Sequence, residues 1–155
     1  MVATLYNWLL FFHIMAAIVW VGGGISLQIL GTRISRSGDR ERLFEMAGEF
    51  EFIGTRVFAP SSLLLLGLGI WMVIIGPWNF GMTWIDLGLA MFAYSFVSGA
   101  FYLGPQLNRM KAIAATEGPE SEHVAELVHR LFVVSRIELT FLVLIVLDMV
   151  IKPFQ

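Results

Sequence analysis

The chain of 155 residues is 57% hydrophobic and 14% charged, whereas soluble domains average about 45–50% and about 25%. This composition predicts a single-domain integral membrane protein over residues 1–155 and gives no indication of nucleic-acid binding. No cysteine is present, which excludes disulfides, thiolate metal sites and c-type haem attachment. The net charge of −2 says little about partners, because the charges of a membrane protein sort by side of the membrane.

Four apolar stretches are long enough to cross a bilayer, which takes about 20 residues in a helix. They run from about 5 to 31, 57 to 76, 84 to 103 and 131 to 151. We interpret the first as a retained span, because it lacks the basic flank and cleavage site of a signal peptide. The sequence therefore predicts an all-α fold, an integral membrane four-helix bundle.

The segment before the last span has its own helical pattern. Pro119 suits a first turn, and apolar residues then recur with helical spacing from Val124 to Phe132. We expect an amphipathic cytoplasmic helix that lies on the inner membrane interface and leads into the fourth span.

Basic residues are distributed unevenly between the connections. Five arginines lie between the first and second spans, three basic residues lie between the third and fourth, and Arg136 lies near the inner end of the fourth. The N-terminal tail and the 76–83 turn carry none. Basic loops face the cytoplasm. We therefore expect a multi-pass protein of the bacterial inner (plasma) membrane with both termini periplasmic or extracellular.

Glu138 is an ionisable residue within a predicted span, where a charge costs at least about 2.5–3.5 kcal/mol at the bilayer centre. It needs a proton or a partner, and Arg33 or Arg56 at the inner ends of spans one and two would supply an ion pair. The alternative is a proton-handling or ligand-binding role. Asp148 has a simpler explanation, because Lys152 follows it by four residues and this spacing predicts an ion pair along the helix.

His13 is the only histidine inside a predicted span, in the outer part of the first. It is therefore expected to lie apart from Glu138. Small side chains near it leave a smooth helix surface, which admits either a neighbouring helix or a planar macrocycle. The residues one, two and three turns along this face are Ala16, Ala17, Trp20 and Gly24.

A neutral imidazole is a good ligand for haem iron or copper. The other two histidines belong to the cytoplasmic connection, so one chain is not expected to build a bis-histidine haem site within the bilayer. Met91 is the candidate second ligand of a haem iron. Met72 and Met149, near the outer ends of spans two and four, are candidates for Cu(I). The alternative is a structural imidazole hydrogen-bonded between helices.

Several motifs resemble those of known proteins: His13 followed by Trp20-Val21-Gly22-Gly23, then Arg56-Val57-Phe58-Ala59-Pro60, and finally Arg136-Ile137-Glu138-Leu139 through Lys152-Pro153-Phe154. They resemble a loose group of small bacterial membrane proteins. The group comprises the HemJ-type protoporphyrinogen oxidases, the CopD-type copper-resistance proteins and the uncharacterised family called domain of unknown function 2269. The resemblance covers most of the chain.

In HemJ-type proteins the first-span histidine is implicated as a haem b ligand, which by resemblance falls on His13. That family also has a lysine early in the third span, where residues 84–89 offer none, and an asparagine where this chain has Ile137. A HemJ-like oxidoreductase activity is therefore open rather than implied. The uncharacterised family fits better, and it implies a fold but no activity.

The leading hypothesis is a redox-associated protein that binds b-type haem. The expected cofactor-binding residues are His13, Ala17, Trp20, Gly24, Met91 and Glu138. A second hypothesis is copper handling at the periplasmic face, and a third is a non-catalytic accessory or structural subunit. Besides the lipid bilayer, we expect self-association or a larger membrane complex as partners. The sequence contains no hydrolase motif, and no catalytic residue is assigned.

Overall fold

The computed structural model describes residues 2–153, and these are helical apart from short turns. The first three long helices each contain a π-helical turn, labelled η, with α-helix on both sides. The elements are α1 (Val2–Ala17), η1 (Ile18–Gly22), α2 (Gly23–Ser37), α3 (Arg40–Ile53), η2 (Gly54–Phe58), α4 (Ala59–Ile75), α5 (Thr83–Ser98), η3 (Gly99–Leu103), α6 (Gly104–Glu117) and α7 (Glu122–Ile151).

Two tight turns separate the long helices at one end of the molecule. Gly38 adopts a left-handed conformation (φ 75°) and ends α2, and the Asp39 side chain then accepts a hydrogen bond from the Arg42 N–H at 3.0 Å. Likewise, Gly118 (φ 89°) follows α6, and Ser121 caps α7. Glycine tolerates positive φ and Asp or Ser satisfies free N–H groups at a helix start, so the sequence specifies both turns.

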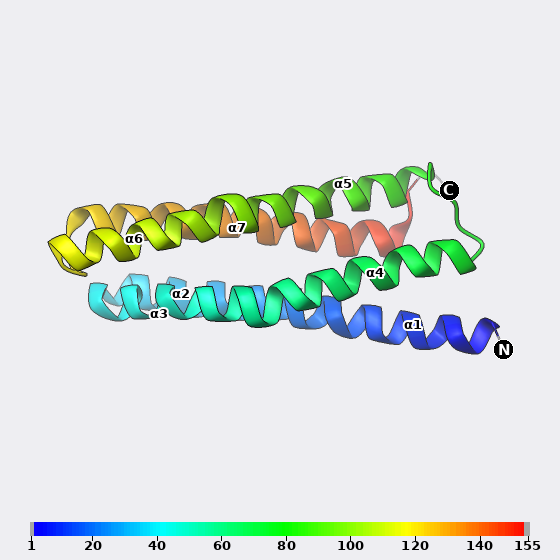
Figure 1. Cartoon of the computed structure of the whole chain (residues 1–155), viewed down its shortest axis with the longest axis horizontal. Helices are drawn as coiled ribbons and strands as arrows, with labels where there is room; N and C mark the ends of the chain where they lie inside the picture. Colours follow the sequence, from blue (N-terminus) through cyan, green and yellow to red (C-terminus); the bar gives the residue numbers. More distant parts are fainter. Residues whose placement is uncertain (1, 154–155) are drawn as a thin grey trace.

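The helices form two layers (Figure 1), with α1 packed against α4 in one and α5 packed against α7 in the other. The described ends of the chain and the α4–α5 connection lie together at one end of the molecule, and the α2–α3 and α6–α7 turns lie at the other. At that second end, α3 contacts α2, α6 and α7, and α7 also contacts α2 and α6.

The hydrophobic core lies at the end that holds the two tight turns. It comprises Ile34, Met46, Ala47, Leu107, Met110, Val124, Val128, Leu131 and Phe132. The apolar face of the expected interfacial helix is thus buried among α2, α3 and α6. The expected helix is present and leads directly into the last apolar stretch as the first part of one continuous α7. Its apolar face packs inside the protein and not on the membrane interface where we expected it.

Three of the four long helices, Ala3–Ser37, Arg40–Ile75 and Thr83–Glu117, are long and apolar enough to cross a membrane. The fourth, α7, carries Arg136, Glu138 and Asp148 in its more apolar part. The first helix is 35 residues long, or about 52 Å at about 1.5 Å per residue, which exceeds the about 30 Å of a bilayer core. The helices therefore continue past the predicted span ends, and their charged parts extend beyond the apolar layer.

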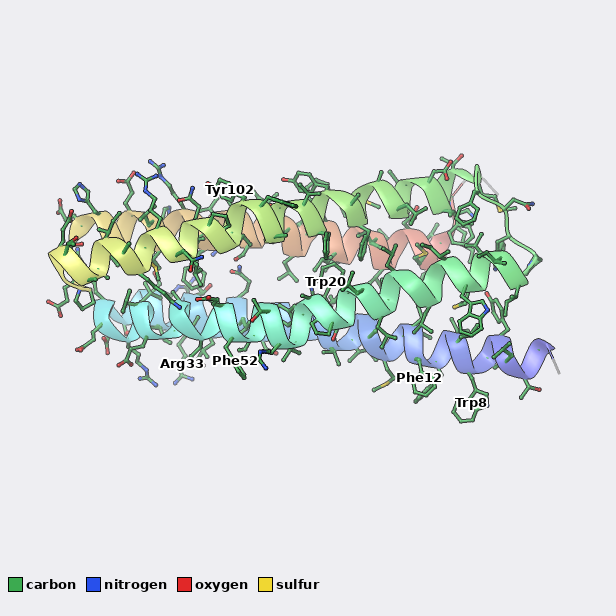
Figure 2. The ribbon with its side chains drawn as sticks, in the orientation of Figure 1. Trp8, Phe12, Trp20, Arg33, Phe52 and Tyr102 are labelled. Atoms are coloured by element: carbon green, nitrogen blue, oxygen red, sulfur yellow. The ribbon has the colours of Figure 1, made fainter. Side chains whose placement is uncertain are left out.

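Large apolar and aromatic side chains cover the outer surface of the molecule from the chain ends to the level of the π turns, a region that we call the apolar half. Trp8, Phe12 and Tyr102 point away from the neighbouring helices (Figure 2), and each is more than 40% exposed. Phe101 and Val150 are 74% exposed. Such a surface is unfavourable in water and suits a lipid environment.

Candidate functional site

A cavity of about 400 Å³ lies between the two helix pairs, and all four long helices line it. Its wall is mostly apolar, with a few polar side chains. The polar members are Gln28, Glu51, Thr55, Ser62, Ser95, Ser135 and Glu138. A largely apolar pocket with a small number of polar groups is the usual form of a small-molecule site.

All three π turns border this cavity. Trp20 comes from η1, the 54–58 turn contributes Gly54, Thr55 and Phe58, and the 99–103 turn contributes Gly99 and Leu103 among others. A π turn forms i→i+5 hydrogen bonds, which widen the helix locally, and such turns are frequent at functional sites. Because all three π turns border one cavity, three helices depart from regular α-helical geometry at the same level of the molecule.

Glu138 lies on α7 at the cavity wall with the Ser98 side chain beside its carboxyl group. Its Oε1 atom is buried and has no hydrogen-bond partner among the described residues. The ion pair predicted with Arg33 or Arg56 is absent from residues 2–153. Both arginines instead point away from the cavity, since Arg56 is exposed and Arg33 lines a groove on the outside.

Two more polar atoms at the cavity are buried without partners within the described chain: Gln28 Oε1 and Ser95 Oγ. Gln28 also donates from Nε2 to the Ser135 hydroxyl, which links α2 to α7. Buried polar atoms are nearly always paired with protein, water or ligand. The three orphaned atoms therefore give the cavity a hydrogen-bonding capacity that its own side chains do not use.

Two further residues of the predicted cofactor surface border the same cavity. The Trp20 ring packs edge-on against Phe92 with 5.5 Å between ring centroids, and Trp20 lies between the two layers (Figure 2). Gly24 faces α7 closely, since a Cβ there would lie 3.3 Å from Leu139. The structure thus brings Trp20, Gly24 and Glu138 together, while Ala17 is half-buried and does not line the cavity.

His13 lies at a different place, in the contact between α1 and α4. Its Nδ1 is 3.0 Å from the Leu65 carbonyl oxygen, and because that oxygen only accepts, Nδ1 carries the proton and Nε2 has a free lone pair. Gly69 makes room for the ring, since a Cβ there would lie 3.1 Å from His13 Cε1. His13 does not line the cavity.

The candidate methionines are divided between the two helix pairs. Met72 follows Leu65 and Gly69 at i+7 and i+3 on α4, which places it on the helix face that meets His13. Met91 belongs to α5, and Met149 packs on Gly88 in the other pair. Among the described residues, no three His, Asp or Glu side chains gather to hold a metal ion.

The prediction of an ion pair between Asp148 and Lys152 is wrong. Asp148 is buried, and neither of its carboxylate oxygens has a hydrogen-bond partner within residues 2–153. Lys152 leaves the helix in a left-handed conformation, and its Nζ lies over the Trp78 ring at 4.0 Å. The cation–π contact replaces the helical pair because the chain turns at Lys152. Phe154, part of the motif that carried the resemblance, lies outside the described residues.

Glu138, Trp20 and Gly24 were predicted from the sequence, but the polar side chains that share their cavity, Gln28, Ser95 and Ser135, were not. Serine and glutamine in a membrane helix carry little signal, since they also occur at ordinary helix contacts. Gly54 and Gly99 begin two of the π turns, so these two glycines could have indicated the irregular turns in the sequence.

Comparison with known proteins places the sequence in one family. The model of a family described as "Predicted integral membrane protein (DUF2269)" matches residues 7–153. No curated protein and no solved structure matches the chain.

Proposed function

This chain belongs to the DUF2269 family of predicted integral membrane proteins, and we propose that it binds a small, largely apolar molecule in the cavity between its helix pairs. Glu138 is the polar anchor. The observation that carries this proposal is the buried, unpartnered Oε1 of Glu138 at the wall of an otherwise apolar cavity.

The chemistry of the wall favours a particular class of ligand. A carboxyl oxygen without a partner accepts a hydrogen bond from an N–H or O–H group, and an ionised carboxylate also attracts a positive charge. Gln28 Oε1 is a second acceptor on the same cavity. The apolar surface then excludes strongly hydrated molecules. The ligand is therefore an apolar body with a basic nitrogen or another hydrogen-bond donor.

A matched pair of probes tests the proposal: 1-aminoadamantane and adamantane-1-carboxylate have the same apolar body and opposite charge. Thermal unfolding of the detergent-purified protein is measured with each probe. The amine is expected to raise the unfolding temperature more than the carboxylate does. In a Glu138→Gln variant this preference disappears, because the charge that discriminates the two probes is gone.

Asp148→Asn is the control, since it removes another buried carboxylate from the same helix but not from the cavity. It is expected to keep the preference for the amine. Equal shifts with both probes in the wild type would overturn the proposal, as would a preference that persists in Glu138→Gln.

His13 supports a second candidate function, the binding of haem b or copper. A backbone carbonyl that holds one imidazole nitrogen and leaves the other free is the usual arrangement behind a histidine ligand. The residues fit ligation by this one histidine, but they do not fit the pair of His13 and Met91, which belong to different helix pairs. Met72 on the same interface fits a soft Cu(I) ion.

Two measurements on the purified protein separate these outcomes. Haem binding predicts a Soret band that changes in His13→Ala, and copper binding predicts stoichiometric copper that is lost in the same variant. If neither appears after supplementation with haem or copper, His13 is a structural residue. That outcome would favour the hypothesis of an accessory or structural subunit.

We also propose that α7 is a fourth span and that both termini face the periplasm or cell exterior of a bacterial inner membrane. The apolar half of α7 packs along α5, so it lies beside a helix that is itself suited to the bilayer. The basic residues concentrate toward the two tight turns, at the end opposite the termini (Figure 1), which supports a cytoplasmic position for that end.

A further inference from the structure

A groove on the outside of the molecule, between α2 and α7, is lined by three arginines. We call it the arginine groove. Its lining residues are Gln28, Ile29, Thr32, Arg33, Arg36, Arg136 and Leu139. Gln28 and Leu139 also line the cavity, so they form the wall between the two sites.

Within residues 2–153, none of the three arginines forms an ion pair. The ion pairs among the described residues join Lys111 to Glu51, Arg130 to Glu126 and His123 to Glu117, all outside the groove. The groove contains no Asp or Glu. Three arginines from two helices thus line one depression, and their positive charges favour an anion there.

The groove also has an apolar end. Along α2, Ile29 precedes Arg33 and Arg36, and along the oppositely directed α7, Arg136 precedes Leu139. Because Gln28 contacts Ser135 and Gly24 faces Leu139 across the two helices, Leu139 lies at the apolar end of the groove and Arg33 and Arg36 lie at its charged end. Ile29 and Arg136 lie between these ends at similar levels. Arg33 projects from the outer side of its helix (Figure 2), and Ile29 is 65% exposed. The groove lies where the apolar surface of the molecule gives way to charge.

We propose that the arginine groove binds the headgroup of an anionic phospholipid. The phosphate contacts Arg33, Arg36 and Arg136, and an acyl chain lies along Ile29 and Leu139. Guanidinium groups bind phosphate oxygens with two parallel hydrogen bonds, and basic pockets between membrane helices on the cytoplasmic side are typical sites for anionic headgroups. A free phosphate would use the arginines but not the apolar end, so the groove as a whole fits a lipid.

Competition between two lipids tests this site. The full-length protein in a non-ionic detergent is mixed with equal amounts of dioleoylphosphatidylglycerol and dioleoylphosphatidylcholine, and native mass spectrometry counts the lipids that remain bound. The wild type is expected to retain the anionic lipid in preference. Arg33→Gln, Arg36→Gln and Arg136→Gln should each reduce this preference about fivefold, from about 1 kcal/mol per basic residue.

The matched control is Arg109→Gln, which removes the same charge from an exposed position on α6 outside the groove. It should keep the preference. Because all four side chains lie outside the buried core, the variants are expected to fold, which circular dichroism verifies. An equal loss in Arg109→Gln would overturn the proposal by showing a general charge effect. Complete displacement of the lipid by inorganic phosphate would also overturn it, as would equal retention of both lipids by the wild type.

Discussion

His13 joins two helices through a single hydrogen bond to a backbone carbonyl. That carbonyl belongs to Leu65, a residue with no polar side chain, so no pattern in the sequence indicates the partner. The same limit applies to Glu138. Its position in an apolar run predicted an unusual role, but its partner depends on the direction in which each side chain leaves its helix. Arg33 and Arg56 have suitable charge and depth, yet both face outward.

Replacing His13 with alanine should lower the free energy of unfolding by about 1 kcal/mol, the typical value of a side-chain hydrogen bond between membrane helices. His13→Gln, which keeps an N–H donor, should recover part of the loss. Chemical unfolding in detergent measures the effect. Ile14→Ala is the control, because Ile14 is 47% exposed on the same helix. If His13→Ala is no less stable than this control, the bond to Leu65 contributes nothing.

Among the elements, α2 and α7 approach closely at Gly31. A Cβ at this position would lie 2.0 Å from Phe132 Cε1 and 2.9 Å from Met46 Cε, and the Phe132 ring itself packs edge-on against Phe50 at 5.7 Å. The core at the charged end therefore depends on the absence of a side chain at residue 31. Gly67 offers a contrast, since no contact from the described part of the chain lies within 4 Å of a Cβ built there.

Gly31→Ala should consequently destabilise the protein by about 1–3 kcal/mol through overpacking, less the gain of up to about 1 kcal/mol in helix propensity. Gly67→Ala has the propensity gain without the clash and should be neutral or stabilising. Thermal unfolding of the two variants side by side gives the comparison. Equal unfolding temperatures would mean that the α2–α7 contact adapts at no cost.

The π turns explain why helix positions were easier to predict than the site. Hydrophobic composition and length identified the four long helices, because a long apolar stretch is a strong signal. One extra residue inside a continuous apolar run leaves that signal unchanged, so η1, η2 and η3 were not predicted. The cavity that they border was therefore not predicted as a whole, although Trp20, Gly24 and Glu138 were chosen individually.

Deleting one residue from a π turn should convert it to regular α-helix and keep the flanking helices in phase. Phe101 is suitable in η3 because it is 74% exposed. We expect the deletion variant to stay folded but to lose the preference for 1-aminoadamantane. Deletion of Val97, 52% exposed in the regular helix α5, should instead rotate the rest of the helix and reduce stability strongly. If the Phe101 deletion variant binds the probes as the wild type does, the π turn in η3 is not required for ligand binding.

At the scale of the whole molecule, the chain has an apolar half and a more polar half with different packing. The apolar half consists of the α1–α4 pair and of α5 packed on the second part of α7, and the main hydrophobic core, which includes the first part of α7, lies in the polar half. The sequence predicted the all-helical membrane class and the family, both of which are confirmed. It did not predict how far the helices extend, because the charged segments after each span look like solvated connections until their apolar faces are seen to pack together.

The absence of natural cysteines allows a direct test of topology. Asn79→Cys places a thiol at the exposed α4–α5 connection, and Glu120→Cys places one at the exposed α6–α7 turn. In intact cells, a membrane-impermeant maleimide should label the first variant and not the second, and permeabilised cells should show labelling of both. Labelling of Glu120→Cys alone in intact cells would show the opposite orientation.

Calorimetric titration with 1-aminoadamantane shows whether Glu138 anchors a ligand in the cavity between the helix pairs. We expect saturable binding of one probe per chain in the wild type and in Asp148→Asn, and a loss of that binding in Glu138→Gln. A titration of Glu138→Gln that cannot be distinguished from the wild type would contradict it.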